Sequence, residues 1–351
     1  MATNLKRIVY FNEQLGGTAE QVNSRRSDIS MNWADSDRQP EAAWAELGAA
    51  HGYHVAARTE LRAPWFPNAD LIARTPNLLA VCSLGAGYDV IDVDACTDAG
   101  IIVCNQSGAN TEAVAEHTLG FILNLSKKIA ITDRLMRRQE GIDRYRYKGN
   151  DILGRTLGII GIGNIGSRVT ELCAGLFKTK VLAYDPYLTA EQIAARGATK
   201  TELDDLLRRS DFVTMHCPKT QETLDLMSYE QFSLMKPTAF FINTSRGGTY
   251  NENDLARALK EERLAGAAID VFAKEPPPTS HPLMAFDNVI VSPHIAGITH
   301  EAFDNLFIFS ADQWIDILDG KVPPRLVNRE AWPKYSERFE RILGFRPAVL
   351  D

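Results

Sequence analysis

Six short apolar runs, separated by helix-like stretches, constrain the fold of this chain more than any other feature. The runs occupy residues 156–161, 180–184, 211–216, 239–243, 267–271 and 289–292. They are rich in β-forming side chains and nearly all apolar, which is typical of parallel strands covered on both faces. The stretches between them read as helices at residues 164–177, 202–209, 228–234 and 253–262. This alternation predicts a doubly wound α/β domain with a parallel sheet.

A looser alternation precedes this region and predicts a second, smaller α/β domain. Strands are expected at residues 7–11, 78–82 and 101–104, with helices at residues 40–51 and 93–99. A long helical pattern runs from residue 111 to about residue 138, and another covers residues 301–319 before a proline-containing tail. Both would lie where the chain crosses between domains. The smaller domain would then consist of residues 1–118 and 302–351, and the larger one of residues 119–301.

Composition narrows the classes of function. A net charge of −7 disfavours nucleic acid or an anionic membrane as a partner, and no apolar run is long enough to span a bilayer. The start of the chain lacks the apolar stretch of a secretory signal. Five scattered cysteines without a C-x-x-C pair favour neither a disulfide framework nor a metal site. We therefore expect a cytoplasmic protein whose partner is neither nucleic acid nor a membrane.

A glycine-rich loop joins the first strand of the larger domain to its first helix. Gly161, Gly163 and Gly166 form the pattern G-x-G-x-x-G at this junction. The first glycine permits a tight turn, the second lets the backbone approach a pyrophosphate, and the third lets helix and strand pack closely. The amino end of the helix then attracts the anion. By itself the pattern could mark only tight packing, but its context predicts a dinucleotide-binding site.

An acidic residue supports this interpretation and selects the cofactor. Asp185 stands at the end of the next strand, where a carboxylate would hydrogen-bond the hydroxyl groups of the adenosine ribose. The same charge would repel a 2′-phosphate, and Pro186 and Tyr187 beside it provide no arginine to bind one. The predicted cofactor is therefore NAD rather than NADP.

Three polar residues follow the later strands of the same predicted sheet. Arg246, Glu275 and His294 come after the strands at residues 239–243, 267–271 and 289–292, at the edge where open α/β sheets bind ligands. A guanidinium fork can bind a carboxylate in a bidentate manner. A histidine, which titrates near neutrality, can protonate a developing alkoxide, and a neighbouring carboxylate orients it.

Each of these residues alone has an ordinary explanation. An arginine after a strand is commonly a surface or capping residue, Ser-Pro-His is commonly a turn, and glutamate before proline commonly lies in a solvated loop. Their shared edge behind a dinucleotide loop predicts hydride transfer between a nicotinamide and carbon 2 of a small 2-hydroxy or 2-oxo acid.

At these residues the chain resembles the D-isomer-specific 2-hydroxyacid dehydrogenases, which include glycerate, phosphoglycerate, D-lactate and formate dehydrogenases. The similarity extends over about residues 76–300. It implies a Rossmann domain inserted into a flavodoxin-like substrate domain, in a homodimer. It also disfavours formate oxidation, because the formate dehydrogenases of the family have glutamine where Glu275 stands.

The resemblance also implies roles for individual residues. Arg246 would bind substrate, His294 would be the acid–base group and Glu275 its partner. Asp270 would face the nicotinamide carboxamide, although its pattern fits a strand-end turn equally well. Cys217 and Pro218 would flank the adenosine. The remaining cofactor contacts would come from Asn164, Ile165, Thr223, Thr244, Ser245 and Gly297, with Arg246 and His294 beside them.

A second glycine-containing loop, in the smaller domain, resembles the substrate loop of the family. Backbone N–H groups of Ala86 and Gly87, following Gly85, could cradle the substrate carboxylate, or the segment is a simple turn. His117 is expected to pack in the core or at an interface. Tyr250 and Asn251 depart from the family pattern at a position that is usually more apolar and acidic.

Three functions are consistent with this pattern. The substrate loop is most similar to that of reductases for glyoxylate or hydroxypyruvate. An alternative, 3-phosphoglycerate dehydrogenase, would need additional basic residues such as Arg58, Arg62 and Arg74 at its pocket. A third, from a different class, is an NADH-sensing binding protein similar to the corepressors of this fold, which would not turn over any 2-oxo acid.

Overall fold

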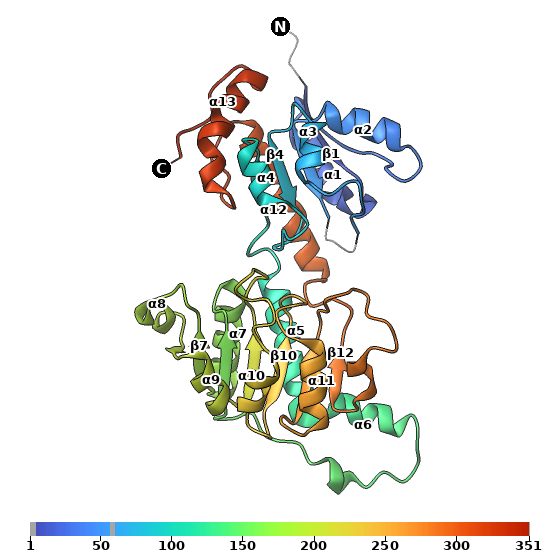
Figure 1. Cartoon of the computed structure of the whole chain (residues 1–351), viewed down its shortest axis with the longest axis vertical. Coiled ribbons are helices and arrows are strands. Elements are labelled where there is room, and N and C mark those ends of the chain that lie inside the picture. Colours follow the sequence, from blue (N-terminus) through green and yellow to red (C-terminus); the bar gives the residue numbers. More distant parts are fainter. Residues whose placement is uncertain (1–4, 57–59, 351) are drawn as a thin grey trace. The chain divides into compact units, whose positions relative to one another are not determined.

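The computed structural model describes residues 5–56 and 60–350 (Figure 1). These residues divide into two compact units. The terminal unit contains the residues up to Asn110 and those from His300 onward, and the central unit is Thr111–Thr299. The domain boundaries expected after residues 118 and 301 stay a prediction. The helix that begins at Thr111 packs on the central unit, and the chain therefore leaves the terminal unit before this helix.

The central unit is built on a seven-stranded parallel sheet with the order β12-β11-β10-β9-β6-β7-β8. Its strands are β6 (Thr156–Ile160), β7 (Lys180–Tyr184), β8 (Thr199–Lys200), β9 (Phe212–Met215), β10 (Phe240–Asn243), β11 (Gly266–Ile269) and β12 (Val289–Val291). The six predicted strands are confirmed. The sequence did not indicate β8, because both of its residues are exposed and it has no apolar pattern.

Helices cover both faces of this sheet, as the doubly wound prediction requires. They are α5 (Thr111–Lys127), α6 (Ile129–Met136), α7 (Asn164–Phe177), α8 (Ala190–Ala194), α9 (Leu203–Arg209), α10 (Tyr229–Leu234) and α11 (Glu252–Lys260). Alternate strand residues point to opposite faces. Ile159 packs with α5 and α7, while Ile160 packs with α9, α10 and α11. Apolar residues on both faces explain why the strands lack polar alternation.

The prediction of a single helix from residue 111 to about residue 138 is wrong, because the structure has two helices there. Lys128 has a left-handed backbone with φ of +58°, which separates α5 from α6. The Asn124 side chain accepts a hydrogen bond from the Ala130 N–H at 2.7 Å and so satisfies the start of α6. The apolar spacing continues through the break, so periodicity alone did not reveal it.

The terminal unit contains a five-stranded parallel sheet with the order β2-β1-β3-β4-β5, which is the flavodoxin-like order. Its strands are β1 (Lys6–Tyr10), β2 (Ile29–Trp33), β3 (Gly52–Val55), β4 (Ala80–Ser83) and β5 (Ile102–Cys104). Its helices are α1 (Gly16–Arg25), α2 (Pro40–Gly48), α3 (Ala69–Ala73), α4 (Val93–Asp98), α12 (His300–Leu318) and α13 (Trp332–Leu343).

The C-terminal segment completes the terminal unit, as the discontinuous arrangement predicted. Trp314 of α12 is fully buried and lies over Gly52, where an added Cβ would be 2.5 Å from the indole ring. The proline-containing tail forms α13, with Pro333 in its first turn, where the missing N–H is tolerated. Segments from both ends of the chain therefore share one core.

Two observations bear on the class of protein. In residues 5–56 and 60–350, no helix has both the length and the apolar character needed to cross a bilayer. All five cysteines are buried, and none of them forms a disulfide in this structure.

Candidate active site

The glycine loop connects β6 to α7 with the geometry expected of a phosphate cradle. Gly161 has φ of +85°, and a Cβ there would lie 2.8 Å from the Cys217 backbone nitrogen. A Cβ on Gly166 would lie 2.4 Å from the Gly161 carbonyl oxygen. At Gly163, by contrast, a Cβ would meet nothing within 4 Å. The loop thus leaves open space at the amino end of α7, where a pyrophosphate would fit.

Asp185 directly follows β7 and faces the glycine loop. Its Oδ2 accepts a hydrogen bond from the Ile162 N–H at 3.2 Å, and its Oδ1 accepts one from the Tyr187 N–H at 3.1 Å. The carboxylate therefore supports the loop as well as marking the predicted ribose site. The Tyr187 hydroxyl donates to the exposed Glu222 carboxylate, a second acidic group that the sequence did not single out.

Cys217 and Pro218 follow β9, opposite the glycine loop. Burial raises the pKa of the Cys217 thiol to about 11, which agrees with a packing role and not a nucleophilic one. The Thr223 hydroxyl donates to the Pro218 carbonyl at 2.7 Å and accepts from the Thr220 N–H at 2.8 Å. Thr223 therefore closes the turn over residues 218–223.

The segment after β10 carries Arg246. The buried Asn243 side chain accepts hydrogen bonds from the backbone and hydroxyl of Ser245, at 2.8 and 2.7 Å, and so shapes the turn. Thr244 is buried, and its hydroxyl pairs with that of Thr118 at 2.9 Å. Arg246 is partly exposed, and its Nη1 donates to the Ser245 carbonyl at 2.7 Å.

His294 and Glu275 form a hydrogen-bonded pair. The imidazole Nδ1 lies 2.7 Å from the Glu275 Oε2, and the other carboxylate oxygen accepts from the Phe272 N–H at 2.9 Å. An ionised carboxylate only accepts, so Nδ1 donates and Nε2 is directed away from the pair. The His294 side chain is 38% exposed while Glu275 is 16% exposed. The predicted partnership is thus present in the structure.

The strand order brings the three predicted catalytic residues to one edge. β10, β11 and β12 are neighbours, and Arg246, Glu275 and His294 each follow one of them. Parallel strands end on the same side of a sheet, so these side chains lie at the carboxyl edge, where β6 and the glycine loop also end.

Asp270 has a structural role in addition to the one predicted for it. Its fully buried carboxylate accepts hydrogen bonds from the Ser292 hydroxyl and from the Ile295 and Ala296 N–H groups, the latter two at 2.9 and 3.0 Å. It therefore holds the loop that contains His294, whose backbone N–H donates to the Asp270 carbonyl at 2.8 Å. Contact with a nicotinamide stays a prediction.

His117 contacts Ser292, the residue whose hydroxyl donates to Asp270. Its Nε2 lies 3.3 Å from the Ser292 hydroxyl, and its ring meets Phe121 edge-on at 4.4 Å between centroids. Burial lowers the pKa of His117, which favours the neutral ring. The expectation of a packed histidine agrees with these contacts.

The departure at Tyr250 and Asn251 has a structural explanation. The buried Tyr250 hydroxyl donates to the Val271 carbonyl at 3.1 Å, and Asn251 caps the amino end of α11. Burial, followed by the nearby carboxylates of Glu252 and Glu275, raises the pKa of Tyr250. Tyr250 therefore holds the backbone just after β11, in the segment that leads to Glu275.

The predicted substrate loop follows β4 in the terminal unit. The carbonyl oxygens of Gly85, Ala86 and Gly87 accept hydrogen bonds from the Gln106 N–H, the Asn105 amide and the Ser83 hydroxyl, at 2.9, 2.7 and 2.6 Å. In a trans peptide the next N–H points the opposite way. The N–H groups of Ala86 and Gly87 therefore face away from these partners, as a carboxylate cradle requires.

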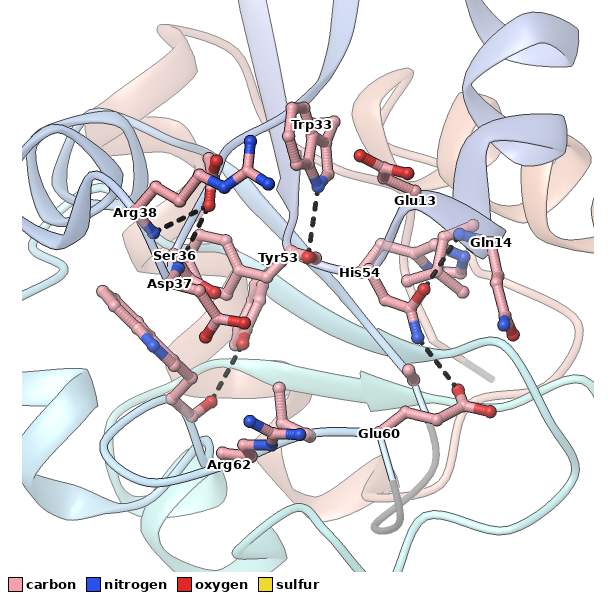
Figure 2. A pocket seen from close by; sticks show the side chains of 17 residues that line it. Glu13, Gln14, Trp33, Ser36, Asp37, Arg38, Tyr53, His54, Glu60 and Arg62 are labelled. Carbon is pink, nitrogen blue, oxygen red and sulfur yellow. Dashed lines mark hydrogen bonds between the residues drawn. The ribbon is translucent and has the colours of Figure 1, made fainter.

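A cavity of about 420 Å³ lies in the terminal unit, where β1, β2 and β3 end (Figure 2). Its aromatic wall includes Trp33, Tyr53 and Trp65. The charged groups that line it, within the described part of the chain, are the carboxylates of Glu13, Asp35, Asp37 and Glu60 and the guanidinium groups of Arg38 and Arg62. The negative side chains thus outnumber the positive ones.

The comparisons with known proteins agree with this geometry. Residues 119–296 match the model of the D-isomer specific 2-hydroxyacid dehydrogenase NAD-binding domain. The chain is 38% identical over 267 residues to a glyoxylate reductase of Thermofilum pendens, covering 75% of this chain and 78% of that one. It is 37% identical over 261 residues to a D-3-phosphoglycerate dehydrogenase of Archaeoglobus fulgidus, of which it covers only 49% and thus spans about half.

A solved structure extends the similarity to most of the chain. The D-lactate dehydrogenase of Aquifex aeolicus, complexed with NAD and lactic acid, superposes with a TM-score of 0.75 at 29% identity, covering 89% of this chain and 96% of that one. The family model, the glyoxylate reductase relative of which this chain covers 78%, and the similar D-lactate dehydrogenase structure all support the same conclusion. The chain belongs to the D-isomer-specific 2-hydroxyacid dehydrogenase family and is an NAD-dependent oxidoreductase.

Proposed function

We propose that this enzyme reduces a small 2-oxo acid of the glyoxylate or hydroxypyruvate type with NADH. The observation that carries the proposal is the 2.7 Å pair of His294 and Glu275, which follow β12 and β11, while Arg246 follows β10 beside β11. The names of the glyoxylate reductases among the relatives support the substrate class.

The reaction needs a cationic group to bind the substrate carboxylate and an acid to protonate the oxygen on carbon 2. Arg246 binds the substrate carboxylate through its guanidinium fork. The N–H groups of Ala86 and Gly87 are the substrate donors predicted for the terminal unit. NADH, when bound, supplies the hydride to carbon 2. His294 delivers a proton from Nε2 to the oxygen on that carbon, which yields the 2-hydroxy acid, and Glu275 stabilises the positive imidazolium before transfer. Hydride and proton together balance the two-electron reduction.

The cofactor is held in this proposal by the glycine loop and by the strand ends beside it. The N–H groups of Asn164 and Ile165 bind the pyrophosphate at the amino end of α7. Asp185 binds the ribose hydroxyls, and Cys217 and Pro218 flank the adenosine. Asp270 would face the nicotinamide carboxamide, and further contacts with the cofactor would come from Thr223, Thr244, Ser245 and Gly297.

Replacing Asp185 with asparagine is expected to raise the ratio of kcat/KM with NADPH to that with NADH by roughly tenfold to a hundredfold. Asparagine retains an acceptor for the Ile162 N–H but removes the charge that repels a 2′-phosphate. Initial rates with both cofactors measure the ratio. Asp205→Asn, in an exposed ion pair with Arg209, serves as the control. A ratio that does not change would remove Asp185 from cofactor selection.

The cavity of the terminal unit favours an uncharged group on the substrate. We propose that it accommodates the group attached to the 2-oxo acid, because it lies at the same sheet edge as the loop of Ala86 and Gly87. Among the described residues that line it, carboxylates outnumber guanidinium groups, which opposes a phosphate. Arg62 lines the cavity, Arg74 instead stacks on Trp44 at 3.4 Å, and Arg58 lies outside the described residues. This disfavours the 3-phosphoglycerate dehydrogenase alternative.

Oxidation of NADH against a panel of acids tests the proposal. The panel contains glyoxylate, hydroxypyruvate, pyruvate, phenylpyruvate, 2-oxoglutarate and 3-phosphohydroxypyruvate. We expect the highest kcat/KM with glyoxylate or hydroxypyruvate, at least about tenfold above the phosphorylated acid, which corresponds to about 1.4 kcal/mol. A preference for 3-phosphohydroxypyruvate would select the alternative. NADH binding without turnover of any acid would support the corepressor-like protein.

The assembly and the compartment belong to the same proposal. A homodimer follows from the resemblance to the family.

A cytoplasmic location is supported by the five unpaired cysteines, because such thiols persist in a reducing compartment. The terminal unit would bind substrate and the central unit NAD.

A further inference from the structure

The turn that follows β11 is held by two carboxylates. The Phe272 N–H donates to Glu275 Oε1 at 2.9 Å, and the next N–H, that of Ala273, donates to Glu252 Oε1 at 2.6 Å. The second carboxylate oxygen of Glu275, Oε2, accepts a hydrogen bond from the His294 Nδ1 at 2.7 Å. The orientation of Glu275 therefore depends on where the backbone of this turn lies, and Glu252 binds that backbone one residue further along.

Glu252 is itself oriented by a histidine. Its Oε2 lies 2.9 Å from the Nε2 of His281, and the two side chains are 18% and 10% exposed. The His281 Nδ1 accepts the Leu283 N–H at 3.3 Å, so Nε2 carries the hydrogen and donates to Glu252. The His281 ring also packs edge-on against Phe272 at 5.3 Å. Glu252 thus has both oxygens engaged.

The segment after β10 is packed against this turn along its backbone. A Cβ on Gly247 would lie 1.9 Å from the Phe272 carbonyl oxygen, so only glycine permits the approach. Three residues later the Tyr250 hydroxyl donates to the Val271 carbonyl. The segment that begins at Arg246 and ends at Glu252 therefore braces the turn that contains Glu275.

We infer that Glu252 and His281 are positioning residues for the acid–base pair, an inference that rests on the proposed function. They hold the Ala273 N–H and thereby keep the Glu275 carboxylate against Nδ1 of His294. Without them the turn has one fewer backbone restraint. Glu275 then spends less time in contact with His294, and the imidazolium needed for proton delivery is less stabilised.

A double-mutant cycle distinguishes this role from a merely structural one. We expect Glu252→Gln to lower kcat roughly tenfold with the KM for NADH unchanged, because one amide oxygen replaces the two carboxylate oxygens that engage Ala273 and His281. In a Glu275→Gln background the same change should alter kcat less than about twofold, because the residue through which it acts is already gone. Equal factors in both backgrounds would overturn the inference. Glu230→Gln, an exposed carboxylate, is the matched control.

The pH profile provides a second measure. Reduction requires the protonated imidazole, so kcat/KM falls as the pH rises, and Glu252→Gln should move this fall toward lower pH. His281→Phe retains the ring packing on Phe272 but removes the donor to Glu252 and the acceptor of the Leu283 N–H. It should move the profile in the same direction by a smaller amount. A profile that neither variant moves would contradict the inference.

A spectroscopic measurement separates this inference from the proposed function. In the NMR spectrum the His294 Nδ1–H, bonded to a carboxylate, should give a downfield resonance, assigned by its absence in His294→Asn. We expect the resonance to shift or broaden in Glu252→Gln and to remain in Glu230→Gln. If the unmodified enzyme turns over no 2-oxo acid, the proposed function fails, and the resonance still tests the positioning. An unaltered resonance in Glu252→Gln would refute it.

Discussion

Replacing His294 with asparagine is expected to lower kcat for the preferred 2-oxo acid by about 10²–10⁴-fold, the usual contribution of a positioned acid–base group. Asparagine can still accept or donate a hydrogen bond, but it cannot supply a proton near neutral pH. The dissociation constant for NADH, measured by quenching of protein fluorescence, should change less than about twofold. The loop of His294 should remain in place, because Asp270 holds it through backbone N–H groups.

The control for this experiment is an exposed histidine at the start of α12. His300→Asn should retain full turnover, since His300 is exposed and takes no part in the pair of His294 and Glu275. If His294→Asn turned over the acid as fast as the unmodified enzyme, the proton would have to come from another group. The mechanism proposed for this site would then be wrong.

The second large effect is expected at Arg246. Replacement with lysine should lower kcat/KM for the 2-oxo acid by about 10²–10³-fold, because an ammonium retains the charge and loses the two parallel N–H donors. Each charged hydrogen bond contributes about 1.5–3 kcal/mol, so the loss of one fork bond accounts for at least a tenfold effect. Steady-state kinetics with varied acid at saturating NADH measures it.

A matched substitution excludes a general effect of arginine-to-lysine exchange. Arg208→Lys changes an exposed ion pair with Asp204 on α9 and should leave kcat/KM unaltered. Retention of activity in Arg246→Lys would mean that charge alone suffices at this position. Arg246 would then act as a general electrostatic group, and the bidentate binding of the substrate carboxylate would be excluded.

Parts of the fold followed from local pattern because neighbouring residues determine them. The six buried strands of the central unit were predicted because both faces of the sheet are covered, which leaves runs with almost no polar residue. The glycine loop was recognisable because backbone geometry at Gly161 and Gly166 excludes any side chain. Neither the strands nor the glycine loop required information on which strands are neighbours in the sheet.

Other parts did not follow, for reasons that are equally physical. β2 and β3 were missed because the helices around them and the C-terminal helix α12 provide the burial that makes them strands. The break at Lys128 was missed because the apolar spacing continues across it while the interruption is a single backbone rotation. Tyr250 had no interpretation until its partner, the Val271 carbonyl, was known.

The distinction is sharpest at the strand ends that carry the candidate site. The alternation of apolar runs and helices by itself determined a parallel α/β sheet, a dinucleotide loop with a carboxylate after the next strand, and three polar groups after later strands. Such features depend on spacing along the chain. Only the tertiary structure decided that β10, β11 and β12 are neighbours and that Glu275 meets His294 at 2.7 Å. Only it paired Glu252 with Ala273 and His281, 21 and 29 residues away, because hydrogen bonds between distant segments depend on register and packing and not on local sequence.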